Sequence, residues 1–202
     1  MVAPKKHADE LVLDQIRDTF WARGYAGTSI SDLEGAVGLN RSSLYASYGD
    51  KRRLFEKAID RYSETVAQKA KSLSANDNGG VALVGVLRNR ASRVADHKTP
   101  EGCLMTRAFI ELGAEDSDLG RKLRSIGTAS VSQLKKLVAK AQSQGAVDPD
   151  LDPKQVAQLI VAVNHGMCVV KTATGSDSAP RKIADLLLSL LGLEPEAGGP
   201  KK

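Results

Sequence analysis

Cysteine, histidine and aromatic residues are scarce in this 202-residue chain. Its two cysteines, Cys103 and Cys168, lie far apart without a CxxC pair, and its three histidines show no metal-ligand spacing. This excludes a disulfide framework and a zinc site, and it favours a reducing compartment. Aromatic residues make up only 4% of the chain. Leucine, alanine and valine must therefore build the core, which favours packed helices over a β-sandwich.

Long apolar runs and a secretory signal are missing as well. The longest apolar stretches, such as residues 159–163, are a few residues long, so we expect no membrane-spanning segment and no membrane partner. The first ten residues, MVAPKKHADE, carry charges but lack the apolar core of a signal peptide. We therefore expect a cytoplasmic protein.

Signatures of catalysis are absent too. We find no glycine-rich phosphate loop, no Ser/His/Asp arrangement, no metal-ligand set and no convincing pair of carboxylates. We therefore expect no enzyme activity, no catalytic or metal-binding residue and no cofactor. A helical enzyme remains an alternative.

The charge balance is mildly basic, with a net charge of +5 and an isoelectric point near 9.2. Such a balance suits a polyanionic partner, but ordinary solubility explains it equally well. Residues 1–57 hold nine basic and eight acidic side chains, whereas residues 41–57 hold five basic and two acidic ones. Any anion-binding surface in this half must therefore be positive locally.

Apolar residues recur at spacings of three and four throughout the chain, without strand-like alternation, and predict an all-α fold of about nine helices. Residues 1–8 and 194–202 are expected to be flexible. The expected helices run from Asp9 to Gly24, Ser29 to Gly38, Asn40 to Gly49, Asp50 to Leu73, 81–96, Leu104 to Leu112, 117–143, Val156 to Val170, and Ile183 to Leu191.

Only Gly38, Leu39 and Asn40 separate the short second and third helices. Two helices joined by a tight turn with glycine are typical of a helix-turn-helix, whose second helix enters the major groove of DNA. In the third helix Leu44 can face the protein interior. Arg41 can donate two hydrogen bonds to a guanine edge, and Tyr45 can donate to a phosphate. Lys51 opens the next helix, where free backbone N–H groups also attract phosphate. This pattern predicts binding to duplex DNA.

The run GYAGTSISDLEGAVGLNRSSLYASYGDKRRLF, residues 24–55, strongly resembles the DNA-binding domain of the tetracycline-repressor (TetR) family over about thirty positions without a gap. One departure is Ser47, where many members carry histidine. The resemblance implies contacts to double-stranded palindromic operator DNA from the second helix, the third helix and the start of the fourth. The expected DNA-contacting residues are Thr28, Ser29, Ser31, Asn40, Arg41, Ser42, Ser43, Tyr45, Ser47, Tyr48 and Lys51.

The resemblance also implies a homodimer with a DNA-binding domain at 1–52, a helical effector-binding and dimerisation domain at 53–193, and a tail at 194–202. Members pair their last two helices across a two-fold axis, and here those helices are the most apolar segments. The expected dimer interface comprises Val156, Ile160, Val163, Met167, Ile183, Leu187 and Leu190.

The implied pocket for an unknown small-molecule effector is expected between the sixth helix, the middle of the seventh and the eighth, with candidate residues on the sixth and eighth helices. They are Leu104, Met105, Arg107, Phe109, His165 and Cys168. His165 could equally be a core histidine bound to a backbone carbonyl. Cys103 begins the sixth helix, where the helix dipole favours a reactive thiolate if the sulfur is accessible, although cysteine is commonly buried and inert.

Taken together, these features predict a repressor that an effector releases from its operator. A repressor that senses electrophiles or oxidants through Cys103 is the alternative. A DNA-binding protein whose second domain only dimerises or recruits a protein partner also stays open, as does activation in place of repression.

Overall fold

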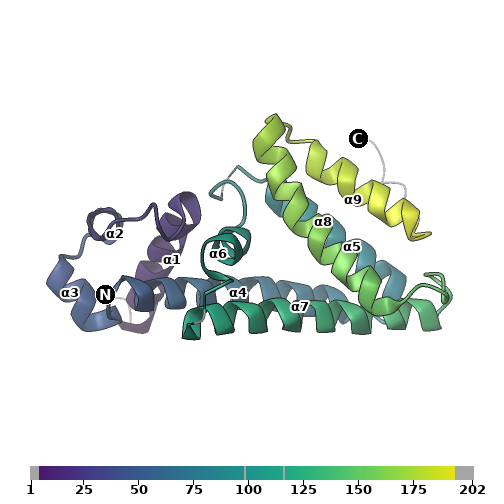
Figure 1. Ribbon diagram of the computed structural model, residues 1–202, viewed down its shortest axis with the longest axis horizontal. Coiled ribbons are helices and arrows are strands. Elements are labelled where there is room, and N and C mark those ends of the chain that lie inside the picture. Colours follow the sequence, from purple (N-terminus) through teal and green to yellow (C-terminus); the bar gives the residue numbers. More distant parts are fainter. Residues whose placement is uncertain (1–4, 98, 116, 194–202) are drawn as a thin grey trace. The chain divides into compact units, whose positions relative to one another are not determined.

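The computed structural model describes residues 5–97, 99–115 and 117–193, and within these ranges it contains nine α-helices and no strand (Figure 1). The all-α prediction is therefore confirmed. The helices are α1 (Lys5–Arg23), α2 (Ile30–Val37), α3 (Arg41–Tyr48), α4 (Lys51–Ser74), α5 (Gly79–Ala95), α6 (Leu104–Leu112), α7 (Asp118–Ser143), α8 (Pro153–Thr174) and α9 (Ala179–Leu190).

The ends of several helices differ from expectation; α8 begins at Pro153 and ends at Thr174, and α9 begins at Ala179. α1 begins at Lys5, so residues 5–8 continue the helix instead of forming part of a flexible arm. Residues 1–4 and the expected tail at 194–202 lie outside the described residues. α5 begins at Gly79, before its expected start at residue 81, because the side chain of Asn78 caps it by accepting the backbone N–H of Val81 at 3.0 Å.

The short helices begin where capping side chains stand in the sequence. The Ser29 hydroxyl accepts the Asp32 backbone N–H, and the Asp32 carboxylate accepts the Ser29 backbone N–H, which completes a capping box at α2. The Asn40 side chain caps α3 through the N–H of Ser43 at 2.9 Å. Asp50 caps α4 through the N–H of Arg53 at 2.9 Å. All three caps stand at the residues where the sequence predicts these helices to begin.

The described residues form two compact units, and the expected division of the chain at residue 52 stays a prediction. One unit comprises the described residues up to 67 and those between 99 and 124, and the other comprises the described residues between 68 and 97 and from 125 to 193. The first unit therefore contains α6 and the start of α7 in addition to the N-terminal helices. The boundaries fall inside α4 and α7, so each of these helices contributes to both units.

Aromatic residues hold the first unit together. The rings of Phe20 and Phe55 meet edge to face with 4.9 Å between centroids, and Tyr25 lies 5.0 Å from Phe55. Trp21 packs against Tyr62 at 4.9 Å. Large aliphatic side chains of α1, α2, α3 and α4 are fully buried as well; they are Ile16, Leu33, Leu44, Leu54 and Ile59.

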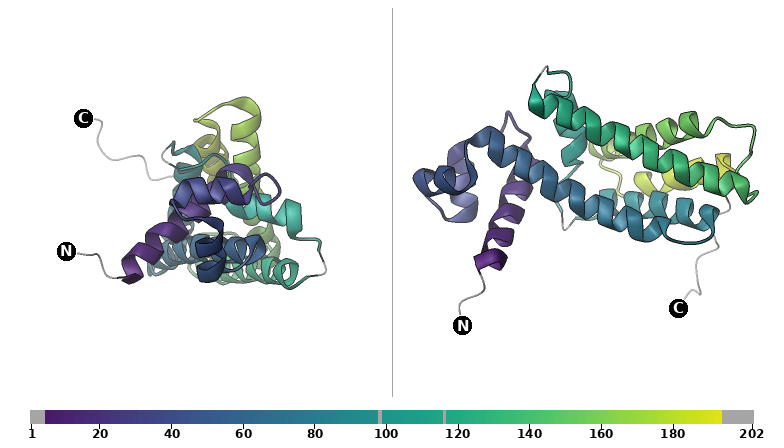
Figure 2. Two further views of the ribbon diagram at one scale, coloured as in Figure 1. Left: turned by 90° about the vertical axis from the view of Figure 1, so that its left-hand side faces the viewer. Right: turned by 90° about the horizontal axis from the view of Figure 1, so that it is seen from below.

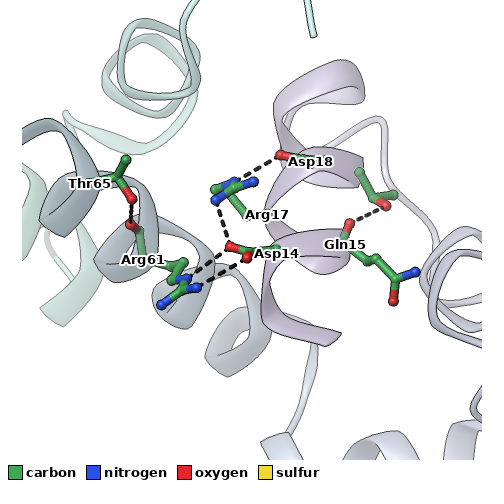
Figure 3. Close-up of polar contacts among 7 residues, drawn as sticks. Asp14, Gln15, Arg17, Asp18, Arg61 and Thr65 are labelled. Atoms are coloured by element: carbon green, nitrogen blue, oxygen red, sulfur yellow. Dashed lines mark hydrogen bonds and ion pairs between the residues drawn. The ribbon is translucent and has the colours of Figure 1, made fainter. Parts of the chain in front are cut away.

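An ion-pair cluster joins α1 to α4 in the same unit (Figure 3). The Asp14 carboxylate accepts two hydrogen bonds from the Arg61 guanidinium, at 2.9 and 3.1 Å, and one from Arg17 at 2.7 Å. Bidentate geometry fixes direction as well as distance. The hydrogen bonds from Arg61, together with the charges of both arginines, hold the pKa of Asp14 below its ordinary value, although partial burial opposes this.

In the second unit, α5, α8 and α9 lie side by side (Figures 1 and 2). Leucines, valines and alanines fill the space between them and α7. Buried side chains include Leu83 and Leu87 on α5, Ile160 on α8, and Leu187 and Leu188 on α9. This core uses no aromatic residue among its buried members, which agrees with the composition.

α8 is the one described helix whose length and apolar composition would allow it to cross a membrane. This measure rests on length and composition alone, so the expectation of no membrane-spanning segment stays a prediction. Core helices of soluble proteins pass the same test. Here Val156, Ile160 and Met167 are buried against the other helices of the unit.

Candidate nucleic-acid interface

The turn between α2 and α3 is fixed from both sides. Gly38 has the left-handed backbone conformation, with φ of +67°, and donates its N–H to the carbonyl of Glu34 at 2.9 Å. The Glu34 side chain in turn accepts the backbone N–H of Arg41 at 2.6 Å. With Asn40 as the cap, two side chains outside α3 therefore set where α3 begins and how it leaves α2.

α3 has one buried and one exposed side, as expected for a helix that reads DNA. Leu44 is fully buried in the core of the first unit, whereas Arg41, Ser42 and Ser47 are exposed. Ser43 and Tyr45 are half-buried. α3 therefore presents a guanidinium and hydroxyl groups around its exposed side. These groups can donate to base edges and phosphates, as the predicted set requires.

Arg41 and Tyr45 contact each other along α3. The Arg41 guanidinium lies 5.2 Å from the centre of the Tyr45 ring, and its Nη2 donates to the Tyr45 hydroxyl at 3.4 Å. One helical turn separates the two residues, which places them on the same face. A guanidinium held in this way keeps its remaining N–H groups available for an acceptor.

Lys51 lies at the start of α4 and has a contact that the sequence did not suggest. Its ammonium lies 4.5 Å from the centre of the Tyr25 ring. Burial raises the pKa of Tyr25, although the nearby charge of Arg52 acts in the opposite direction. Tyr25 therefore serves as a neutral platform that directs Lys51. Both residues belong to the run 24–55, but nothing in their spacing along the sequence indicated that they meet.

Three predicted contact residues use their side chains within the protein. Thr28 is only 1% exposed and donates its hydroxyl to the Gly24 carbonyl at 2.6 Å, so its prediction as a side-chain contact to DNA is wrong in this conformation. Ser29 is exposed but donates its hydroxyl to Asp32. Tyr48 is half-buried and donates to Asp9 at 3.3 Å, and burial raises its pKa. Ser31 and Asn40 are exposed at the starts of their helices.

The candidate effector residues divide between the two compact units. Leu104 and Met105 are buried, and Arg107 and Phe109 are half-buried, all in the first unit. His165 is half-buried and Cys168 buried in the second unit. The Cys168 sulfur accepts a hydrogen bond from Arg90 at 3.2 Å. A shared pocket for these six residues stays a prediction.

Cys103 does not meet the condition for a reactive thiol. It is the N-cap residue of α6, as predicted, but it is only 3% exposed. Its sulfur lies 3.4 Å from the hydroxyl of Tyr62. Because a reactive cysteine must be accessible, the buried and inert alternative describes Cys103 in this conformation.

Most residues of the predicted dimer interface are buried within the protomer. Four of its seven residues are buried in the protomer itself and are not available to a partner; they are Val156, Ile160, Met167 and Leu187. Val163 and Ile183 are half-buried, and Leu190 is exposed. The large apolar side chains that α8 and α9 expose are Leu159, Val169, Val170, Leu186 and Leu190, which we call the exposed apolar face.

Similar proteins combine these elements. The HTH-type transcriptional repressor ComR of Escherichia coli (strain K12) is 27% identical over 189 residues, which cover 93% of this chain and 90% of that protein. A TetR transcriptional regulator from Chloroflexus aurantiacus has a TM-score of 0.83 at 22% identity, covering 94% of this chain and 96% of that one. The regulator CifR, solved with 26-base-pair operator DNA, has a TM-score of 0.79 at 23% identity, covering 89% of this chain and 95% of that one.

Two family models match the sequence directly. Residues 12–58, which include the helix-turn-helix, match the model for bacterial regulatory proteins of the tetR family. Residues 81–187, more than half of the chain, match the tetracyclin repressor-like C-terminal domain. The sequence, the fold and the geometry of α2 and α3 agree, and the chain belongs to the TetR family of DNA-binding transcriptional regulators.

Proposed function

We propose that this chain represses transcription by binding a palindromic operator as a homodimer, and that a small-molecule effector releases it. The observation that carries the proposal is α3, with Leu44 in the core and Arg41, Ser42 and Ser47 exposed. The similarity to a named repressor, ComR, and to CifR bound to operator DNA supports the same assignment. A protein that acts on chromosomal DNA would work in the cytoplasm.

The exposed apolar face supports the homodimer. Leu186 and Leu190 are one helical turn apart on α9, and Leu159 and Val170 lie on α8. A two-fold axis would let the same face of two chains cover each other, which removes apolar surface from water without a second kind of partner. A symmetric dimer also presents two copies of α3 to the two halves of a palindrome.

Release by an effector requires a difference in affinity between two states of the dimer. To weaken operator binding a hundredfold, the effector must favour the released state by about 2.7 kcal/mol. Operator DNA must then weaken effector binding by the same factor. α4 is our candidate for transmission, because it begins directly after α3 and contributes residues to both compact units.

Selection of bound fragments from genomic DNA, with the region upstream of the protein's own gene as the first candidate, tests the proposed function. The expected result is a palindromic site that binds much more tightly than unrelated DNA at physiological salt. Arg41→Ala should reduce this preference, whereas Ile110→Ala, a change at an exposed residue of α6, should preserve it. A wild-type protein that binds all fragments equally would contradict the proposal.

A further inference from the structure

The end of α6 contacts the turn that leads into α2, within the first compact unit. The Glu111 carboxylate accepts the backbone N–H of Ala26 at 2.9 Å, across 85 positions of the sequence. Gly24 has φ of +76°, and a Cβ added to it would collide with the same carboxylate. The turn between α1 and α2 therefore lets the Glu111 carboxylate approach its backbone closely.

The Tyr25 ring of this turn packs against Phe55 and Lys51 of α4. The other hydrogen bonds of the turn are local: Gly24 donates its N–H to the Phe20 carbonyl at 2.8 Å, and the Thr28 hydroxyl donates to the Gly24 carbonyl. The N–H of Thr28 reaches the Tyr25 carbonyl only at 3.4 Å. The next residue is Ser29, the cap of α2. The position of the turn therefore decides where α2 begins and, through the short α2–α3 turn, where α3 lies.

Further polar contacts connect the same region of α6 and α7 to α4. Arg52 donates to the Glu115 carboxylate at 3.1 Å and to the Ser117 hydroxyl at 2.6 Å. Lys122 pairs with Asp60 at 2.6 Å. Arg52 directly follows Lys51, a predicted phosphate contact. The segment from Glu111 to Lys122 thus contacts the α1–α2 turn through Glu111 and α4 through Glu115, Ser117 and Lys122.

We propose that Glu111 is a positioning residue for the DNA-reading helices: its carboxylate holds the α1–α2 turn at the place where α2 and α3 can engage the operator. The inference rests on the proposed function and assigns a role to a residue outside the DNA-contacting set. Any movement of α6 must either carry the α1–α2 turn with it or break the bond to Ala26. In the second case the α1–α2 turn loses its hydrogen bond to α6 and keeps the contacts of Tyr25 with α4.

The test compares three variants of Glu111 that separate reach from charge. Glu111→Gln keeps an acceptor oxygen at the same reach but removes the charge, Glu111→Asp keeps the charge but is one methylene shorter, and Glu111→Ala removes both. Ile110→Ala is the matched control, because Ile110 is 77% exposed on the same helix. Hydrogen exchange reports the Ala26 amide, and fluorescence anisotropy reports binding to operator and to unrelated DNA.

We expect Glu111→Ala and Glu111→Asp to speed exchange at Ala26 and to weaken operator binding, each by about three- to tenfold, as for loss of one exposed hydrogen bond. Glu111→Gln and Ile110→Ala should retain both properties near wild type. Affinity for unrelated DNA should not fall in any variant, because none removes a basic group. A purely structural role for Glu111 would instead weaken binding to both kinds of DNA.

A double-mutant cycle with Gly24→Ala makes the test independent of any single variant. The added methyl group is strained by the positive φ and also meets Glu111, so its effect on operator affinity should be smaller in the Glu111→Ala background. Additive effects, or equal operator affinity in wild type and Glu111→Ala, would overturn the inference, as would Glu111→Gln behaving like Glu111→Ala. If wild type itself shows no operator preference, the proposed function fails before Glu111 is tested.

Discussion

Leu186 and Leu187 are neighbours on α9, one exposed and one buried. Substitutions at these two positions can therefore distinguish an effect on dimerisation from an effect on folding. Leu186 is 62% exposed, whereas Leu187 is 4% exposed in the core of the second unit. If the exposed apolar face is the dimer interface, Leu186→Ala should weaken the dimer and leave the protomer folded. Leu187→Ala should instead destabilise the protomer.

The size of the effect follows from the exposed surface. Full burial of a leucine side chain contributes about 2 kcal/mol. Leu186 is 62% exposed in the protomer, so a partner can bury about that share of its surface. An alanine at this position would still bury a small part of the apolar surface and keep that part of the stabilisation. The loss is then about 1 kcal/mol per protomer. A two-fold axis doubles it to about 2 kcal/mol, or roughly thirtyfold in the dimer dissociation constant. Leu187→Ala creates a cavity and should reduce the free energy of unfolding by about 2–5 kcal/mol.

Sedimentation velocity over a dilution series measures the dissociation constant, and urea unfolding at fixed protein concentration measures stability. Leu190→Ala provides a second test of the same face, because Leu190 is 73% exposed. If both Leu186→Ala and Leu190→Ala dimerise like wild type, the interface lies elsewhere. A wild-type chain that stays monomeric at every concentration would refute the homodimer itself.

Three further predictions concern the first unit. Arg41→Ala should weaken operator binding by roughly 1–3 kcal/mol and relax discrimination at one position of each half-site, whereas Tyr45→Phe should weaken binding to all DNA alike; equal losses on every sequence for Arg41→Ala would remove Arg41 from base recognition. Lys51→Ala should reduce the slope of log affinity against log salt concentration by about one unit for each DNA-binding domain. An unchanged slope would mean that Lys51 contacts no phosphate. Asp14 has a folded pKa below its ordinary value near 3.8, so its contact with Arg61 adds stability above that pH and loses it as the pH falls through the folded pKa. Asp14→Asn should accordingly be less stable than wild type at neutral pH and should converge with it in acid; a constant difference in urea unfolding across the pH range would contradict this.

The helix-turn-helix was predictable because its determinants are local. Ser29, Asp32, Asn40 and Asp50 cap helices within three residues of themselves, and Gly38 adopts the left-handed conformation that the turn needs. Short-range hydrogen bonds of this kind depend on residue type and spacing, so the sequence alone locates them.

The orientation of α8 and α9 was not predictable in the same way. Apolar residues occupy more than one face of each helix, so spacing identifies both helices without showing which face the protomer buries. Leu186 and Leu187 illustrate this, because adjacent leucines point to different surroundings. The contact between Glu111 and Ala26 was also missed. It joins an ordinary exposed glutamate to a backbone N–H far away in the chain, and neither leaves a pattern in the sequence.

The start of α3 is anchored by groups that do not belong to its reading surface. Glu34 binds a backbone N–H of α3, and Asn40 binds another, so neither bond depends on the side chains that α3 exposes. Leu44 alone ties the middle of the helix to the core. It follows that Arg41, Ser42 and Ser47 can be substituted without loss of the fold. Variants in a library changed at these three positions should fold as the parent does and prefer different operators. The chain is in this respect a ready scaffold for engineered DNA specificity.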